Sequence, residues 1–318
     1  MHAVFLDFAT VSYGDDLDPQ PLYDALPGLV IYPHSTDREI DARLADAEVV
    51  LTNKARITRE RIAASPKLRL VGLTATGTNN VDLDAARERN VAVVNIRDYC
   101  TSSVVQHVYA LLLALTHRVL EFDAAVKRGE WAVPEPAIAA GLPIRELAGR
   151  TLGIVGYGVL GSAVARAGEA FGMTVLVANR PGGAAQPGRV DLADLLATSD
   201  VVSLHCPLTP ATRHLIGAGE LARTKRDAVL INTARGGLVD AQALADALRA
   251  GRLGGAGIDV LETEPPIGGN PLLAPDVPNL IVTPHVAWGA REARQRGLAQ
   301  LAANVTDVLR GGSRGRVA

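Results

Sequence analysis

Three ionisable residues that together could do acid–base chemistry on an anionic molecule lie in the second half of the chain: Arg235, Glu264 and His285. Arginine is a permanent, bidentate partner for a carboxylate, and a histidine paired with an acid gains and loses a proton near neutral pH. Ligands of open α/β sheets bind beyond the carboxyl ends of the strands, so we expect the three residues to meet at one sheet edge. Taken singly, each has an ordinary explanation as a surface cation, a loop acid or a histidine at a turn. Each follows its own apolar run: Arg235 follows 229–231, Glu264 follows 256–260, and His285 follows 280–283.

A glycine-rich loop connects another apolar run, 151–155, to a helical pattern that extends to Phe171. This context is typical of a dinucleotide-binding βαβ unit. The first glycine permits a tight turn, the second lets the backbone approach a pyrophosphate, and the third allows close helix–strand packing. The N–H groups that open the helix then face the phosphates. The alternative is a glycine-rich turn that binds nothing. The loop consists of Gly156, Tyr157, Gly158, Val159, Leu160 and Gly161.

The residue that contacts the adenosine ribose in such units lies about 20 residues after the glycine loop. At the end of the run 174–178 this chain has Asn179 and Arg180, where an acid would hold a ribose 2′-hydroxyl. Without that acid nothing repels a 2′-phosphate, and the guanidinium of Arg180 suits a phosphate dianion. The sequence therefore favours NADP(H) as the cofactor. If Arg180 instead stacks on the adenine, NAD(H) also fits.

Short apolar runs alternate with helical patterns along the whole chain, which is typical of parallel sheets covered by helices. The runs are 4–6, 29–32, 49–52, 70–73 and 91–94 in a first series, and 152–155, 175–178, 201–204, 229–231, 256–260 and 280–283 in a second. Helices are expected at 37–47, 81–90, 102–118, 161–171, 240–250 and 292–310. The sequence therefore predicts an α/β protein of two domains.

Composition excludes several classes of protein. The 318 residues carry a formal net charge of −2, so there is no basic field for nucleic acid. The two cysteines, Cys100 and Cys206, are too far apart for a zinc-binding motif, and we expect no metal. Asp7 interrupts the apolar start that a signal peptide needs, and the longest apolar stretch, 108–115, is shorter than the ~20 residues that span a bilayer. We expect no membrane partner and a cytoplasmic location.

As an ordered set, these motifs resemble the D-isomer-specific 2-hydroxyacid dehydrogenase family, of the glycerate dehydrogenase and hydroxypyruvate reductase kind. The resemblance covers nearly the whole chain and implies two Rossmann-like, doubly wound domains. A dinucleotide-binding domain over 99–286 would be inserted into a flavodoxin-like substrate-binding domain over 1–98 and 287–318. The matching segments are 75–82, 156–161, 202–209, 232–236, 257–265 and 283–285.

The resemblance also implies roles for individual residues. His285 is the general acid, Glu264 pairs with its ring, and Arg235 holds the substrate carboxylate. Asp259 accepts a hydrogen bond from the nicotinamide amide or ribose, its alternative being a loop-capping role, and Lys54 reaches the far end of the substrate. The implied substrate site contains Ala75, Thr76, Gly77, Arg235 and His285. The cofactor site contains the glycine loop with Asn179, Arg180, His205, Cys206, Pro207, Thr212, Thr233, Ala234 and Asp259.

The implied reaction is the reversible, NAD(P)H-dependent reduction of a short 2-oxo acid, such as hydroxypyruvate or glyoxylate, to the D-2-hydroxy acid. Two alternatives stay open: a dinucleotide-sensing, corepressor-like binding protein, and a formate or phosphite dehydrogenase on the same fold. By analogy with the family we expect a homodimer with Trp131 and the rest of 129–142 at its contact, and hinges near 95–101 and 285–291. Gln106 and His107 stand where many relatives carry Ala-Glu, a change for which the sequence offers no mechanism.

Overall fold

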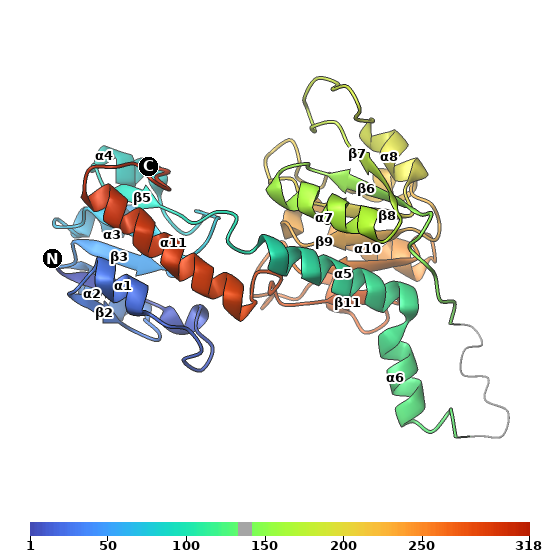
Figure 1. Ribbon diagram of the computed structural model, residues 1–318, viewed down its shortest axis with the longest axis horizontal. Helices are drawn as coiled ribbons and strands as arrows, with labels where there is room; N and C mark the ends of the chain where they lie inside the picture. The colour runs from blue at the N-terminus through green and yellow to red at the C-terminus, as the bar shows by residue number, and fades with distance from the viewer. Residues whose placement is uncertain (133–141) are drawn as a thin grey trace. The chain divides into compact units, whose positions relative to one another are not determined.

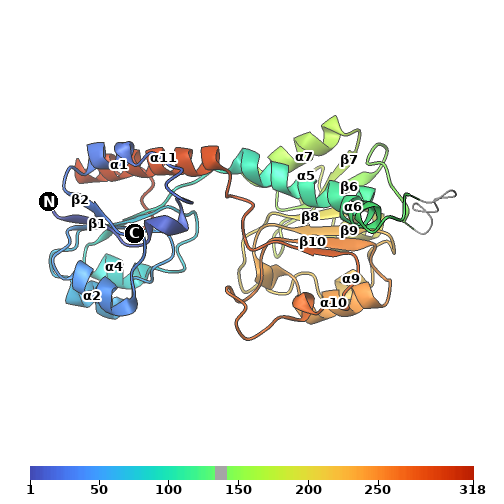
Figure 2. The same cartoon turned by 90° about the horizontal axis from the view of Figure 1, so that it is seen from below.

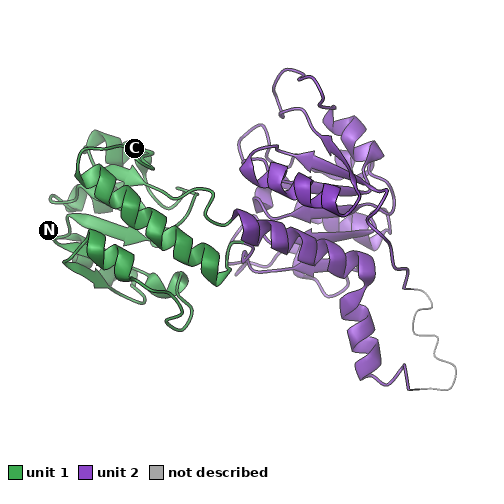
Figure 3. Ribbon diagram, viewed as in Figure 1, with its two compact units in different colours: residues 1–100, 288–318 green, residues 101–287 purple. Residues whose placement is uncertain are grey.

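The computed structural model describes residues 1–132 and 142–318, which form two compact units (Figure 3). Unit 1 comprises Met1–Cys100 and Trp288–Ala318, and unit 2 comprises Thr101–Ala287. The chain thus leaves unit 1, builds unit 2 and returns. The compact units divide at 100/101 and 287/288, and the sequence expectation places the domain boundaries at 98/99 and 286/287.

Unit 1 is built on a five-stranded parallel sheet in the order β2-β1-β3-β4-β5, the strand order of flavodoxin-like folds. The helices α1 and α11 cover one face, and α2, α3 and α4 cover the other (Figures 1 and 2). The strands are β1 (Ala3–Phe5), β2 (Leu29–Ile31), β3 (Val49–Thr52), β4 (Leu70–Leu73) and β5 (Ala92–Val94), and the helices are α1 (Gln20–Ala25), α2 (Asp37–Leu44), α3 (Arg59–Ala64), α4 (Leu83–Glu88) and α11 (Arg291–Leu309).

The sheet of unit 1 has buried residues on both faces, which explains why β3 and β4 are apolar almost throughout. Leu298, Leu301 and Val305 of α11 pack on one face. Ile40 of α2 and Ile62 of α3 pack on the other. The last helix, α11, therefore packs in the first domain and completes the core of unit 1, as the family resemblance alone implied.

Unit 2 is built on a six-stranded parallel sheet in the order β11-β10-β9-β8-β6-β7. Beside β7, an isolated bridge pairs Val190 with Ala178 in parallel, in the place of a further edge strand. Read from this bridge through β7 and β6 to β10, the order is the 3-2-1-4-5-6 of a Rossmann fold, and β11 is one further strand at the opposite edge. The strands are β6 (Thr151–Val155), β7 (Thr174–Val177), β8 (Val201–Leu204), β9 (Val229–Asn232), β10 (Gly255–Ile258) and β11 (Leu280–Val282).

Helices cover both faces of this sheet (Figure 2). On one face α5 (Thr101–His117) packs on β9 and β10 and beside α7 (Val159–Ala170). The approach is close because β10 carries Gly257, where a Cβ would lie 2.9 Å from the Cβ of Leu111. The other face holds α8 (Leu192–Thr198), α9 (Ala218–Leu221) and α10 (Ala241–Arg249), and α6 (Val119–Lys127) follows α5 after a bend.

The expected fold class is confirmed, and the expected runs and helices agree with the observed elements to within a few residues. The ranges expected for helices did not include α1, α3, α6, α8 and α9, which have four to nine residues.

Among the described residues, no single helix is long and apolar enough to cross a membrane. The pair α5 and α6 satisfies the length and composition criteria only when taken together, across a bend of 57°.

Candidate active site

Arg235, Glu264 and His285 follow three strands that are neighbours in the sheet of unit 2. Arg235 comes three residues after β9, Glu264 six residues after β10, and His285 three residues after β11. Because β9, β10 and β11 are adjacent and parallel, their carboxyl ends lie at one edge of the sheet. The sheet thus positions all three loops at the edge where the sequence placed them.

His285 and Glu264 form a direct pair. The Nδ1 of His285 lies 2.6 Å from Oε2 of Glu264, while Oε1 of Glu264 accepts a hydrogen bond from the N–H of Leu261 at 2.9 Å. A carboxylate has no proton to donate, so Nδ1 carries the proton and Nε2 lies on the opposite side of the ring. His285 has a positive φ of 54°, a conformation that L residues adopt only when the surroundings hold it. Its N–H donates to the carbonyl oxygens of Asp259 and Thr283, at 2.7 and 3.0 Å, which provides that hold.

The Arg235 loop is shaped by Asn232, a fully buried residue at the end of β9. Its Nδ2 donates to the carbonyl oxygen of Arg235 at 2.9 Å, and its Oδ1 accepts the N–H of Ala234 at 3.1 Å. The guanidinium of Arg235 is half-buried and donates to the carbonyl oxygen of Ala234 at 2.7 Å. Sequence reasoning treated Asn232 only as part of a motif. An amide at the last position of a buried strand is the signal that could have identified it as an organiser of the loop.

Gly236 brings the Arg235 loop against the loop that carries Glu264. A Cβ at Gly236 would collide with the backbone of Leu261 and Glu262. Only a hydrogen atom at this position leaves room for the two loops to touch. Through this contact the arginine and the acid of the His285 pair belong to one packed assembly.

Asp259 is fully buried, and both of its carboxylate oxygens are used inside the chain. Oδ1 accepts from the hydroxyl of Thr283 at 2.5 Å and from the N–H of Val286 at 2.9 Å, and Oδ2 accepts from the N–H of Ala287 at 2.9 Å. Burial alone raises the pKa of a carboxyl, but these bonds and a contact from His107 outweigh it and lower the pKa of Asp259 below its usual value. These contacts agree with the alternative role of Asp259, loop capping, because its ionised carboxylate fixes the segment around His285.

The glycine loop has the geometry that a pyrophosphate needs. Gly156 has φ of +98°, and a Cβ there would lie 2.5 Å from the backbone nitrogen of Cys206. A Cβ at Gly161 would collide with the carbonyl oxygen of Gly156, whereas a Cβ at Gly158 would meet no atom of the described residues within 4 Å. Two of the glycines are thus required by the packing of the chain itself, and the middle one faces open space. Within the described ranges, 1–132 and 142–318, no side chain caps the start of α7 at Gly158, so its first N–H groups are available to an anion.

The end of β7 carries Asn179 and Arg180, as expected, and one acid that the sequence did not point to. Asn179 donates from Nδ2 to Oδ1 of Asp191 at 2.9 Å, and its own Oδ1 accepts the N–H of Gln186 at 3.0 Å. Arg180 is exposed. Asp191 could not be selected from the sequence spacing, because it lies 12 residues beyond Asn179. The bridge between Val190 and Ala178 brings it next to the end of β7.

The remaining expected cofactor residues follow β8 and β9. His205, Cys206 and Pro207 follow β8 directly, and the imidazole Nε2 of His205 lies 2.8 Å from the hydroxyl of Ser203. Burial lowers the pKa of His205 to about 4, so its ring is neutral at physiological pH. Thr212 is buried, and its hydroxyl donates to the carbonyl oxygen of Pro207 at 2.7 Å, which closes that loop.

Thr233 and Ala234 follow β9. Among the described residues, the hydroxyl oxygen of Thr233 is buried and has no hydrogen-bond partner. A buried hydroxyl without a partner is costly in an isolated chain. The unpartnered hydroxyl of Thr233 and the open space beside Gly158 both lie at the carboxyl edge of this sheet. A bound dinucleotide could bond to the first and approach the backbone at the second, so the residues present fit such a cofactor.

The turn Ala75–Gly77 in unit 1 is held by its own unit. The Thr76 hydroxyl donates to the carbonyl oxygen of Ile96 at 2.8 Å, and Nδ2 of Asn95 donates to the carbonyl oxygen of Thr76 at 2.7 Å. These bonds fix the backbone of the turn and use none of the N–H groups between residues 75 and 77.

Lys54 is exposed on a loop that is organised by Asp7, a residue that sequence reasoning used only to exclude a signal peptide. The buried carboxylate of Asp7 accepts from the N–H groups of Asn53, Lys54 and Ala55, at 2.9, 2.6 and 2.9 Å. An acid directly after the first buried strand is the signal that could have identified it.

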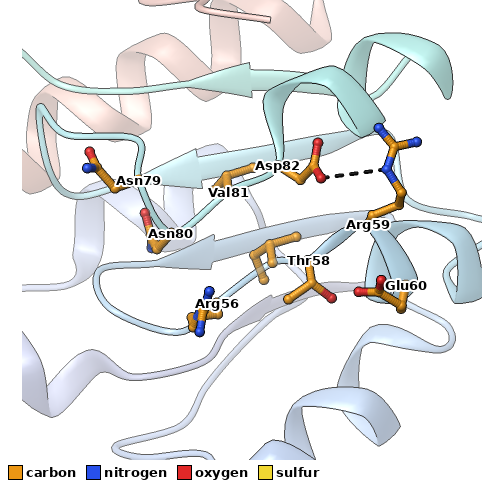
Figure 4. Close-up of a pocket in the computed structure, with 9 residues that line it drawn as sticks. Arg56, Thr58, Arg59, Glu60, Asn79, Asn80, Val81 and Asp82 are labelled. Atoms are coloured by element: carbon orange, nitrogen blue, oxygen red, sulfur yellow. Dashed lines mark ion pairs between the residues drawn. The ribbon is translucent and has the colours of Figure 1, made fainter. Parts of the chain in front are cut away.

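A polar cavity of about 470 Å³ lies in unit 1 between the loops 56–60 and 79–82 (Figure 4). Asn80 joins the two loops, because its Nδ2 donates to the carbonyl oxygen of Ala55 at 3.1 Å. Arg59 at the rim pairs with Asp82, with 3.7 Å between Nε and Oδ2. None of the expected site residues lines this cavity.

Comparison with known proteins agrees with this fold. Residues 109–287, more than half of the chain, match the NAD binding domain of the D-isomer specific 2-hydroxyacid dehydrogenases. A glycerate dehydrogenase of Methylorubrum extorquens is 46% identical over 276 residues, 87% of each chain. A hydroxypyruvate reductase of Blautia hydrogenotrophica is 38% identical over 318 residues, 98% of each chain. A solved structure of a Thermus thermophilus protein, 36% identical, covers all of both chains with a TM-score of 0.86.

The chain belongs to the D-isomer-specific 2-hydroxyacid dehydrogenase family. It is an oxidoreductase that acts on CH–OH donors with a nicotinamide dinucleotide, as the motifs implied. The corepressor-like alternative is thereby set aside in favour of an enzyme.

Proposed function

We propose that this protein reduces a short 2-oxo acid, hydroxypyruvate or glyoxylate, to the D-2-hydroxy acid, and catalyses the reverse oxidation. The observation that carries the proposal is the His285–Glu264 pair, 2.6 Å apart, on the loops that follow β11 and β10 and beside the loop of Arg235. A proton donor and a permanent cation are the two groups that reduction of a carbonyl next to a carboxylate requires. The relatives named glycerate dehydrogenase and hydroxypyruvate reductase support the choice of acid.

Each residue of the site has one task in this proposal. Arg235 binds the substrate carboxylate and polarises the adjacent carbonyl. His285 donates the proton of Nε2 to the carbonyl oxygen, and Glu264 holds Nδ1 and stabilises the charged ring. The dinucleotide supplies the hydride when it is bound. In unit 1, the backbone N–H groups of Ala75, Thr76 and Gly77 are proposed to bind an anionic group.

Steady-state kinetics test the substrate class. The purified protein is assayed with hydroxypyruvate, glyoxylate and pyruvate against NADPH and NADH, and with formate and phosphite as oxidisable substrates. The proposal expects the highest kcat/KM with hydroxypyruvate or glyoxylate. Oxidation of formate or phosphite without reduction of any 2-oxo acid would establish the alternative dehydrogenase chemistry and overturn the proposal.

We infer that NADP(H) is preferred over NAD(H). The exposed guanidinium of Arg180 at the end of β7 supports this, since it offers a 2′-phosphate a cation where other enzymes place an acid. The carboxylate of Asp191, hydrogen-bonded to Asn179, is the observation that favours NAD(H) as the second candidate. The ratio of kcat/KM for NADPH to that for NADH decides between them.

We further propose a homodimer formed through α6 and the segment after it. The side chains of Val119, Leu120, Val126 and Trp131 are 44–66% exposed, which is unusual for apolar side chains on one short stretch. Of the expected contact segment 129–142, residues 133–141 lie outside the described residues. Light scattering after gel filtration measures the mass: a dimer is expected for the native chain and a monomer for Leu120→Asp.

A further inference from the structure

Two residues one helical turn apart on α5 contact the segment that carries His285. Ser103 donates from its hydroxyl to the carbonyl oxygen of Ala287 at 2.6 Å. Four residues later, Nε2 of His107 lies 2.9 Å from the hydroxyl oxygen of Thr283 and 3.4 Å from Oδ1 of Asp259. Residues at i and i+4 share one helix face, so α5 contacts the segment 283–287 from one side at both of its ends.

The hydrogen bonds define which nitrogen of His107 carries a proton. The Thr283 hydroxyl donates its single proton to Oδ1 of Asp259 at 2.5 Å. Its oxygen can therefore only accept from His107, and the carboxylate of Asp259 can only accept as well. Nε2 of His107 is consequently a donor, directed between the two oxygens. The side chain of His107 is 20% exposed, while that of Asp259 is fully buried.

Asp259 is the anchor of the His285 segment, because four backbone and side-chain groups of residues 283–287 bond to it. The N–H groups of Val286 and Ala287 and the hydroxyl of Thr283 donate to its carboxylate, and the N–H of His285 donates to its carbonyl oxygen. A buried carboxylate holds such a segment only while its own charge is stabilised. His107 is the side chain on α5 that contributes to this stabilisation.

We infer that His107 is a positioning residue for the reaction: by donating to Thr283 and Asp259 it fixes the segment 283–287 and thereby the imidazole of His285. The inference rests on the proposed function of His285 as the acid. It also gives a structural reason for a histidine at a position where the sequence offered none. His107 touches the anchor of the segment, and its effect on the reaction passes through Asp259.

The first test measures the segment itself in the protein without cofactor or substrate. In His107→Leu, the amide protons of Val286 and Ala287 are expected to exchange about tenfold faster or more, the order expected for loss of a hydrogen bond to a charged group. His107→Gln, whose Nε2 can replace the imidazole N–H, should restore slow exchange. Gln106→Leu, an exposed neighbour on the same helix, is the matched control and should leave exchange unchanged. If His107→Leu does not fold, His107→Asn replaces it, because its amide is too short to reach Thr283.

The second test measures the reaction. His107→Leu should lower kcat by about tenfold, because an ångström of misplacement at a catalytic group costs this much or more. The KM for the dinucleotide should be unchanged, and His107→Gln should recover most of kcat. Unchanged amide exchange in His107→Leu overturns the inference and leaves the proposed function standing. Faster exchange with unchanged kcat also overturns it. If the native protein reduces no 2-oxo acid, the proposed function fails, while the exchange result still reports on the anchor.

Discussion

The imidazole of His285 and the carboxylate of Glu264 come from loops after two adjacent strands, and they lie 2.6 Å apart. Neither loop is free to separate from the other. Glu264 is held by the N–H of Leu261, and the backbone of Leu261 packs directly on Gly236. The histidine is held from behind by Asp259. The pair is therefore assembled before any ligand arrives, which is what a proton donor of fixed orientation requires.

Replacing Glu264 by glutamine tests the charge of this pair. The amide can still accept from Nδ1 of His285, but it no longer stabilises a charged ring. We expect kcat for reduction of the preferred 2-oxo acid to fall by roughly a hundredfold at pH 7, within the range for loss of general acid–base catalysis. Dinucleotide affinity, measured by fluorescence titration, should be unchanged. A kcat within twofold of the native value would remove Glu264 from the acid–base machinery.

Replacing Arg235 by lysine tests bidentate binding of the substrate carboxylate. Lysine keeps the positive charge but presents a point charge instead of a planar fork. We expect kcat/KM for the 2-oxo acid to fall by roughly a hundredfold or more, with dinucleotide affinity retained. Arg223→Lys, at an exposed arginine of the same unit, is the matched control and should behave as the native protein. Equal loss of substrate turnover and dinucleotide binding would show that Arg235 has been misplaced in the site.

The glycine loop allows fold and ligand effects to be separated. The methyl group of Gly158→Ala meets no atom within 4 Å in the part of the chain that the structure describes, so the free energy of unfolding in urea should change by less than about 1 kcal/mol. The added methyl would nevertheless stand where a pyrophosphate approaches the backbone, and the Kd for the dinucleotide should rise about tenfold or more. Gly156→Ala, with φ of +98° and a neighbour at 2.5 Å, should instead destabilise the chain itself. Undiminished dinucleotide binding by Gly158→Ala would contradict the assignment of this loop.

Removal of the Arg180 side chain tests the preference for NADP(H). If the guanidinium binds the 2′-phosphate, Arg180→Ala should lower the ratio of kcat/KM for NADPH to that for NADH by about tenfold, the order of one charge-assisted pair. Arg166→Ala removes an equally exposed cation from α7 and should leave the ratio unchanged. An unchanged ratio in Arg180→Ala, together with weaker use of NADH by Asp191→Asn, would establish Asp191 as the ribose ligand and NAD(H) as the cofactor.

Periodicity and motif order were sufficient for the fold and for the loops that carry the site. An apolar run indicates a strand that is buried on both faces. A residue just after such a run lies at the carboxyl edge of the parallel sheet, and this position does not depend on the details of side-chain packing. Arg235, Glu264 and His285 could therefore be selected from the sequence. Short helices such as α9, with four residues, could not, because one helical turn has no periodicity to detect.

The residues that organise those loops were not predictable in the same way. Asn232 and Asp7 act through hydrogen bonds to backbone groups that come into reach only once the chain has folded. His107 acts through the side chain of Thr283, 176 residues away in the sequence. Asp191 likewise contacts Asn179 because an isolated bridge at the sheet edge brings the two residues together, and no apolar run in the sequence predicts that bridge. Their partners are set by tertiary packing, and the side-chain type alone is compatible with a solvated surface.

The ring of His205, whose Nδ1 is buried, gives the fold a specific pH dependence. Its pKa is lowered to about 4 by burial, from about 6.5 when exposed. Between these values the unfolded chain binds a proton that the folded chain does not, so this residue lowers stability as pH falls through 6.5 towards 4. From pH 7 to pH 5 the linkage amounts to about 2 kcal/mol in the free energy of unfolding. Urea denaturation at both pH values measures it.

The matching variant is His205→Asn, which removes the titrating ring. Its loss of stability between pH 7 and pH 5 should be smaller than that of the native protein by about 2 kcal/mol, even though the substitution itself lowers stability at pH 7. His117→Asn, at an exposed histidine of the same unit, should retain the native pH dependence. If His205→Asn and the native protein lose stability in parallel, the ring of His205 is protonated as readily in the folded chain as in the unfolded one. Burial would then have to be abandoned as the reason for its neutrality.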